Sequence, residues 1–194
     1  MVKYLQQSLA RWLADIAGTR VYAVRQLSNI GKNFEKEVAE AFGKLPDVSV
    51  DRLYDTTTKF LGHNNICDYI IYRYPHIVYV ECKATKGNTL NFRSGISENQ
   101  WNGLLDKSVI KGVVAGYFVW FHEHDITSFV PAEQMSELRM SGKRSLHVND
   151  LKDNTIIHMP AGGRKKRIYY DYDFTKTMEH IDRYARGDYG LQED

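Results

Sequence analysis

The sequence predicts an α/β protein, because segments with strand character alternate with segments in which apolar residues recur at helical spacing. Two short runs rich in β-branched and aromatic residues, 68–72 and 77–80, flank a turn at Pro75. A longer apolar and aromatic run, 113–121, has the composition of a central strand. With 194 residues the chain is long enough for one domain with a sizeable core, whereas two domains would be cramped.

The composition is that of an ordinary globular protein, with 43% hydrophobic and 26% charged residues. The formal net charge is only +2, so any affinity for nucleic acid has to come from local patches of cations. No apolar stretch reaches the roughly 18 residues of a membrane-spanning helix, and polar residues interrupt the N-terminus too often for a secretory signal. Cys67 and Cys82 lack metal-ligand spacing, and we expect both to be small buried hydrophobes in a reducing cytoplasm.

The N-terminal part of the chain predicts two helices. Residues 3–17 have an amphipathic pattern that favours packing on the core or on a partner subunit, and a less patterned linker follows up to Ile30. Gly31 precedes the second helix, whose apolar stripe consists of Phe34, Val38, Ala41, Phe42 and Leu45. Glu35 lies in its first turn, where the helix dipole by itself favours a carboxylate.

Strands are predicted next. Residues 48–54 can form the first strand, and the polar segment 55–65 is expected to be a loop. In the hairpin that follows, side chains alternate between the two faces. One face then holds Val78, Val80, Cys82 and Ala84, which suit a core, and the other holds Tyr79, Glu81 and Lys83.

The polar face of the hairpin has a chemical use. Asp68 can approach Glu81 from the neighbouring strand, and two converging carboxylates are suitable ligands for Mg²⁺. A bound divalent ion lowers the pKa of a coordinated water and neutralises charge on a phosphodiester. Lys83, on the same face, could orient that water or stabilise the developing anion. The alternative is an edge hairpin that carries an ordinary surface Glu–Lys pair.

The helix after the hairpin has clear start signals. Ser97 and Gln100 fit a capping box, with Ile96 and Trp101 at the positions of a hydrophobic staple. Capping alone would explain Gln100, so its position in the sequence leaves a structural and a functional interpretation open.

The second half of the chain continues with strands and helices. Residues 126–130 are expected to pair with 113–121 across the polar turn 122–125, whose His-Glu-His-Asp cluster could bind a metal but needs only solvent. The remaining expected elements are a helix over 131–140, a basic loop over 141–145, a helical turn over 148–151, short strands over 156–159 and 168–170, a basic loop over 162–167 and a helix over 174–184.

Several polar and basic residues are candidates for contacts with DNA phosphates, although each could equally be a solvated surface residue. These are Thr57, Thr58, Lys59, Lys86, Arg93, Lys143, Arg144, Arg164, Lys165, Lys166 and Arg167.

The spacing Asp68, Glu81, Lys83 resembles the signature of the PD-(D/E)XK nucleases. A longer ordered set, over roughly residues 30–175, is similar to RecU-type Holliday junction resolvases: Thr56–Thr58, Asp68, Glu81, Lys83, Asn91–Phe92 and Gln100. The chain departs from that pattern at Asn99, where such proteins commonly have histidine, and residues 3–17 have no counterpart.

This resemblance implies a restriction-endonuclease-like core, with a mixed central β-sheet flanked by helices, to which the N-terminal helix is an extra element. The expected organisation is a helix and linker at 1–30, the nuclease domain at 31–186 and a frayed tail at 187–194. Asp68 and Glu81 would hold Mg²⁺, with Mn²⁺ as a substitute, Lys83 would orient the water, and Gln100 and Glu35 would assist.

The implied substrate is four-way junction DNA, and paired cleavage of a junction implies a homodimer. Recombination or branch-migration proteins would be partners, and either a bacterium or its phage would suit as the source. The alternatives are a nuclease of the same fold that acts on duplex or flapped DNA, and a non-catalytic DNA-binding partner in recombination.

Overall fold

The structure is a computed structural model that describes residues 30–53, 65–167 and 169–188. The expected helix over 3–17, the DNA-contact candidates Thr57, Thr58 and Lys59, and the end of the tail lie outside these residues. Most of the described chain, from Phe34 on, belongs to one compact unit. The limits expected for the nuclease domain stay a prediction.

The described residues form one helix over 30–43 followed by fifteen elements in chain order. They are β1 (Ser49–Arg52), β2 (Tyr69–Arg73), β3 (His76–Thr85), β4 (Thr89–Asn91), α2 (Phe92–Gly95), α3 (Glu98–Ser108), β5 (Val113–Phe121), β6 (Ile126–Pro131), α4 (Ala132–Met140), β7 (Ser145–His147), α5 (Val148–Lys152), β8 (Met159–Pro160), β9 (Gly162–Lys165), β10 (Tyr170–Asp173) and α6 (Thr175–Ala185).

Most local predictions are confirmed, including the hairpin β2–β3, the central strand β5 and the Ser97 cap of α3. Three expectations were wrong in detail. Ile30 is already helical rather than part of a linker. The strand expected over 156–159 is reduced to β8, and the one expected over 168–170 lies at β10.

The basic run was also expected to be a loop, but Gly162–Lys165 form strand β9, which pairs antiparallel with β10. The two glycines are explained by this pairing. A Cβ on Gly163 would lie 2.6 Å from the carbonyl oxygen of Asp171, and a Cβ on Gly162 would lie 2.9 Å from that of Asp173. The glycines therefore allow β9 to approach β10 closely.

The main sheet is mixed. Its described strands lie in the order β1-β2-β3-β5-β6-β8, with β3 and β5 parallel and all other neighbours antiparallel. A parallel pair needs a crossover, and α2 and α3 lie in the segment that connects β3 to β5. This crossover is what brings α3 against the polar face of the hairpin.

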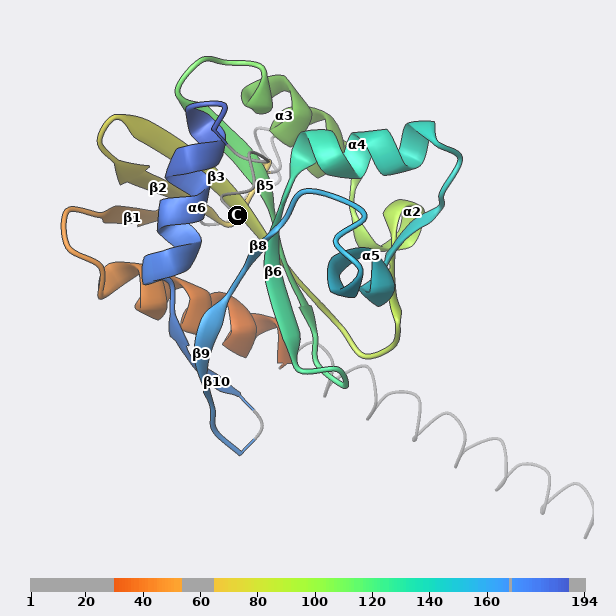
Figure 1. The fold of residues 1–194 in the computed structure, drawn as a ribbon, viewed down its shortest axis with the longest axis horizontal. Coiled ribbons are helices and arrows are strands. Elements are labelled where there is room, and N and C mark those ends of the chain that lie inside the picture. The colour runs from red at the N-terminus through yellow and green to blue at the C-terminus, as the bar shows by residue number, and fades with distance from the viewer. Residues whose placement is uncertain (1–29, 54–64, 168, 189–194) are drawn as a thin grey trace, which may run out of the picture. The chain divides into compact units, whose positions relative to one another are not determined.

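Helices cover both faces of the sheet (Figure 1). The side chains of β5 alternate between the two faces, and their partners show which helices pack on each face. Tyr117, Val119 and neighbouring odd-numbered residues pack into a core with side chains of α3 and α4. On the other face Phe118 lies 5.6 Å from Phe42 of helix 30–43 and 4.9 Å from Phe174, the residue before α6. Successive side chains of β5 therefore pack on opposite faces of the sheet, so the sheet lies between two layers of helices.

Two smaller pairs of strands extend from this sandwich. Strand β4 pairs with β7, which the sequence did not predict, and β9 pairs with β10. The protein is therefore a mixed α/β structure with a central sheet flanked by helices, the arrangement expected for a restriction-endonuclease-like core. None of the helices in the described ranges has the length and apolar character needed to cross a membrane.

Candidate active site

The strand register brings the two candidate carboxylates together. Strand β2 pairs with β3 so that Tyr69 lies opposite Val80, and Asp68 and Glu81 come one step further along each chain. Directly opposed side chains in an antiparallel pair lie on the same face. The Asp68 carboxylate Oδ2 also accepts a hydrogen bond of 2.8 Å from the backbone N–H of Cys82, which fixes it against β3.

Lys83 and Gln100 complete this cluster. The Lys83 Nζ lies 2.9 Å from Oε1 of Glu81 and donates to Oε1 of Gln100 at 3.1 Å. The Gln100 amide Nε2 donates to the same Glu81 oxygen at 2.6 Å. Side chains from β3 and from the first turn of α3 therefore form one connected hydrogen-bonded group.

Gln100 has both of the roles that the sequence left open. Its Oε1 accepts a hydrogen bond of 3.2 Å from the backbone N–H of Ser97, and its own backbone N–H donates to the Ser97 hydroxyl, which completes a capping box. Its Nε2 is left to reach Glu81. Capping fixes the rotamer of Gln100, so the structural role also positions the amide in the site.

Glu81 is unusually buried for a carboxylate, with a relative exposure of 3%. Burial, followed by the charge of Asp68, raises the pKa of Glu81 to about 8, against the lowering effect of Lys83. Burial also raises the pKa of Asp68, although the Cys82 N–H and the Lys83 charge oppose this. The site is thus a low-dielectric location in which two ionised carboxylates are costly without further positive charge.

The donor set fits a hard divalent cation. The Glu81 Oε2 atom is buried and has no hydrogen-bond partner among the residues that the structure describes. The charge of Asp68 is one of the influences that raise the pKa of Glu81, and two ionised carboxylates cannot donate a hydrogen bond to each other. No group of three or more His, Cys, Asp or Glu residues suited to a metal is found within the described ranges. Mg²⁺ needs only one or two protein carboxylates, because water and phosphate oxygens supply its other ligands.

Glu35, the candidate from the first helix, lies close to this cluster. Its negative charge is one of the influences that raise the pKa of Glu81. Its Oε2 lies 3.3 Å from Nη2 of Arg52 on β1, whose guanidinium is also 5.9 Å from the centre of the Tyr69 ring. Glu35 is therefore an acid at the edge of the site, near the carboxylates.

Two residues on α3 join the segments around the site. The sequence marked Asn99 only as a departure from the RecU-type pattern, and it gave no signal for Gly103. The side-chain amide of Asn99 donates to the backbone carbonyl of Asn65 at 3.1 Å. A Cβ on Gly103 of α3 would lie 2.3 Å from Cγ2 of Ile66, so that glycine allows α3 to approach the segment before Asp68. Both contacts join distant parts of the chain, and no local pattern indicates them.

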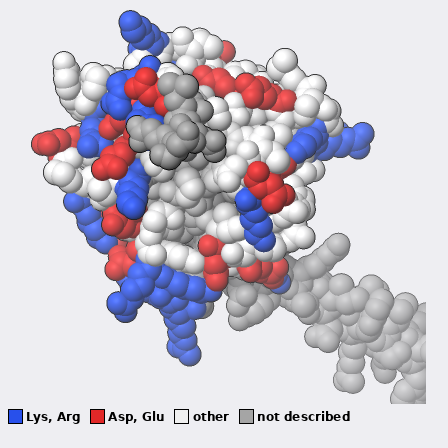
Figure 2. Space-filling model, in the orientation of Figure 1, with Lys and Arg blue, Asp and Glu red and all other residues white. Residues whose placement is uncertain are grey.

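The DNA-contact candidates lie in separate places. Arg93, Lys143 and Arg144 line one cavity, together with Arg139, which was not a candidate. Lys86 is exposed and lies 3.8 Å from Glu123. In Figure 2, blue atoms gather where Figure 1 places the tip of the β9–β10 hairpin, the segment that carries the basic run.

Part of the charge in that basic run is already paired. Lys165 forms a close ion pair with Asp125, and Lys166 lies 3.7 Å from Asp171. Arg164 and Arg167 are exposed. The hairpin tip is therefore less cationic than its sequence indicates.

The polar turn 122–125 lies beside β9, because Asp125 pairs with Lys165. In the same turn His124 Nε2 lies 2.6 Å from Oδ1 of Asn88.

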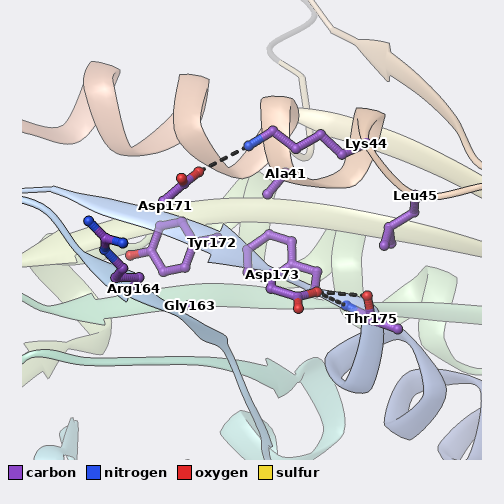
Figure 3. A pocket seen from close by; sticks show the side chains of 10 residues that line it. Ala41, Lys44, Leu45, Gly163, Arg164, Asp171, Tyr172, Asp173 and Thr175 are labelled. Carbon is purple, nitrogen blue, oxygen red and sulfur yellow. Dashed lines mark hydrogen bonds and ion pairs between the residues drawn. The ribbon is translucent and has the colours of Figure 1, made fainter.

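Another cavity, of about 570 Å³, lies between helix 30–43 and strand β10 (Figure 3). Its charged groups are largely engaged with each other or with the backbone. Lys44 donates to Asp171 at 3.0 Å, and Asp173 accepts from the backbone N–H and hydroxyl of Thr175. Its lining includes none of the four clustered residues of the hairpin site.

Fold and site together define a mixed α/β protein with a central sheet flanked by helices, in which Asp68, Glu81 and Lys83 of the hairpin cluster with Gln100 of α3. No protein-family model and no curated protein sequence matches the chain. Among solved structures, it is similar to Archaeoglobus fulgidus Hjc, a Holliday junction resolvase from an archaeal hyperthermophile. The similarity covers 54% of this chain and 78% of that one, at 16% sequence identity and a TM-score of 0.41. Values this low do not transfer that protein's activity to this chain.

Proposed function

We propose that this protein is a Mg²⁺-dependent endonuclease that hydrolyses DNA phosphodiester bonds, with Mn²⁺ as a substitute. The single observation that supports this most strongly is the cluster of Asp68, Glu81, Lys83 and Gln100, in which a buried carboxylate oxygen has no partner within the described residues. A structural Glu–Lys pair on an edge strand would not be buried, and would not be contacted by a capping glutamine from another element.

In this proposal Asp68 and Glu81 hold the cation. When bound, the cation supplies a more acidic water and neutralises charge on the phosphate. The Lys83 side chain is 18% exposed, and from its place beside Glu81 its ammonium can orient the attacking water or donate to the developing anion. Gln100 fixes the Glu81 carboxylate, and the Glu35 carboxylate adds negative charge at the edge of the site.

We further propose junction resolution of the RecU type as the particular activity. The support is the ordered set of motifs in the sequence, from Thr56 to Gln100. This activity implies a homodimer, because both strands of a junction must be cut, and a cytoplasmic protein that works beside recombination or branch-migration proteins. A nuclease of the same fold that acts on duplex or flapped DNA would use the same residues, since junction choice depends on the assembled dimer.

The test is cleavage of labelled DNA in Mg²⁺, Mn²⁺ and Ca²⁺ by the full chain, with a four-way junction, a flap and a linear duplex of matched sequence. We expect cleavage in Mg²⁺ and Mn²⁺, faster on the junction, and loss of at least about 100-fold in Asp68→Asn. Asp106→Asn, an exposed carboxylate on α3, is the matched control and should cleave like the wild type. Cleavage that survives Asp68→Asn would disprove the mechanism, and equal rates on all three substrates would remove the junction assignment.

A further inference from the structure

A basic cavity of about 640 Å³ lies beside the first turn of α3, apart from the clustered carboxylates. Three segments form its walls: the start of α2, the start of α3, and the end of α4 with the loop after it. The lining residues are Asn91, Phe92, Arg93, Glu98, Arg139, Lys143 and Arg144. Four of them are cationic and one is acidic.

The charges of this cavity are unevenly compensated. Lys143 lies 2.5 Å from Oδ1 of Asp150, a carboxylate whose side chain is 7% exposed, so its charge is locally neutralised. Arg139 lies 3.8 Å from Glu98, and both of these side chains are largely exposed, so that pair is weak. Within the described residues Arg93 and Arg144 form no ion pair, and both are exposed. The cavity therefore presents two guanidinium groups with unsatisfied charge.

Backbone hydrogen bonds hold the segment that carries Arg144. Helix α4 ends in a Schellman motif: the Gly142 N–H donates to the Arg139 carbonyl, the Lys143 N–H donates to the Leu138 carbonyl, and Gly142 has φ +90°. The Phe92 N–H then donates to the Arg144 carbonyl at 3.0 Å.

Side chains on the other walls are fixed in the same way. Asn91 caps α2, with its Oδ1 accepting from the Arg93 and Ser94 N–H groups. The Arg139 guanidinium lies 4.8 Å from the centre of the Trp101 ring, and that ring is 5.3 Å from Phe92. Because the backbone of these walls is already held, an anion bound there would have to order only the exposed arginine side chains.

The cavity and the carboxylate cluster share one helix turn. Glu98 lines the cavity, and Gln100, two residues later, contacts Glu81. Two residues correspond to about 3 Å along a helix axis and about 200° around it, so the two sites lie on opposite flanks of the N-terminus of α3. A polyanion whose phosphates recur every few ångströms can reach both at once.

We propose that this cavity binds phosphates of the DNA strand next to the cleaved bond, with Arg93 and Arg144 as the two principal ligands and Arg139 as a third cation. The inference rests on the proposed nuclease function and adds to it a subsite that aligns the strand over Asp68 and Glu81. Arginine suits this role, because its planar fork binds phosphate oxygens in pairs.

The test measures DNA affinity without divalent ions, so that binding is separated from cleavage. Fluorescence anisotropy of a labelled four-way junction and of a labelled duplex is followed over a series of NaCl concentrations, for the wild type and for Arg93→Ala/Arg144→Ala. We expect the double variant to bind about 10-fold more weakly, and the slope of log K against log[NaCl] to fall by about one for each arginine. Arg93→Lys/Arg144→Lys keeps both charges and should recover most of the slope.

The matched control is Lys111→Ala/Lys176→Ala, which removes the same net charge at two exposed positions, one in the turn before β5 and one on α6. It should retain the wild-type slope. Thermal melting of all variants checks that each is folded. The inference is overturned if the alanine pair keeps the wild-type slope, or if the control loses as much as the alanine pair. It is also overturned if the wild type does not bind DNA, or if inorganic phosphate occupies the cavity while the alanine pair leaves DNA affinity unchanged. Failure of the nuclease proposal is a separate result, namely absence of Mg²⁺-dependent cleavage by a protein that binds DNA.

Discussion

Replacing Glu81 with glutamine should stabilise the metal-free protein while removing its proposed function. The folded protein raises the pKa of this carboxyl from 4.5 to about 8, chiefly by burial and then by the charge of Asp68. At pH 7 the unfolded chain therefore carries an ionised Glu81, and the folded chain must either take up a proton or hold a buried charge. Glutamine avoids this cost, and its Nε2 can donate to Asp68 from the place of the unpartnered oxygen.

The magnitude follows from proton linkage. Each pKa unit between the unfolded value and the working pH corresponds to about 1.4 kcal/mol, so Glu81→Gln should gain up to about 3 kcal/mol at pH 7. Glu81 is almost fully buried, so solvent screening reduces this value little. For a protein of this size, that gain corresponds to a rise in Tm of up to about 10 °C.

The sign of the pH dependence is fixed. Between pH 4.5 and about pH 8 the folded state binds the Glu81 proton more tightly than the unfolded state does, so wild-type stability falls as the pH rises through this window. The advantage of Glu81→Gln should therefore be near zero at pH 4.5, grow with pH and level off above about pH 8.

The assay is thermal and urea unfolding of both proteins in EDTA across this pH range, repeated with Mg²⁺. The ion should raise the Tm of the wild type, because it binds the folded state only, and should do so much less for Glu81→Gln. An advantage that does not change with pH, or a less stable variant at pH 7 in EDTA, would refute the account of Glu81 as a strained buried acid.

Three further substitutions test other parts of the structure. Asp150→Asn should destabilise the fold, the opposite of the effect of Glu81→Gln. Burial raises the pKa of Asp150, but hydrogen bonds and the charge of Lys143 lower it overall. The variant should therefore lose about 1–3 kcal/mol of unfolding free energy in urea at pH 7, and that loss should fade as the pH falls below 3.8. Gly103→Ala should displace Ile66, cost about 1–3 kcal/mol and slow cleavage, whereas Gly43→Ala, with nothing within 4 Å, should do neither in the same melts and assays. Gln100→Ala should lower Tm slightly through the lost cap and reduce the cleavage rate severalfold or more; an unchanged rate would leave capping as its only role.

Local sequence patterns were sufficient for the parts of the fold in which neighbours along the chain determine the structure. Alternation with period two predicted that Val78, Val80 and Cys82 of β3 are buried on one face, and an unbroken apolar run predicted β5. Alternation did not predict that the other face of β3 is covered as well, where Glu81 is buried and Tyr79 packs against the core. The S-x-x-Q spacing predicted the cap of α3, because all its hydrogen bonds lie within four residues.

Local sequence patterns could not predict contacts between segments that are distant in the sequence. The β9–β10 pairing was missed because glycines and cations have low strand propensity, and only the close approach to β10 explains the glycines. The pairing of β4 with β7 was missed because each has three residues, too few for a pattern to be visible. The basic cavity could not be predicted because its two principal arginines are far apart in the sequence. Arg93 and Arg144 lie 51 positions apart, and the Phe92–Arg144 hydrogen bond joins their segments in the folded chain.

The sequence by itself determined the α/β class, the hairpin that carries Glu81 and Lys83, and the helix that begins at Ser97. Each of these depends on side-chain periodicity or capping within a few residues. Only the tertiary structure decided that Gln100 reaches across from α3 to Glu81, and that Glu81 is buried enough to have a pKa of about 8. The physical reason is that burial and electrostatic proximity belong to the packed sheet and helices, and no single segment possesses them before it folds against the others.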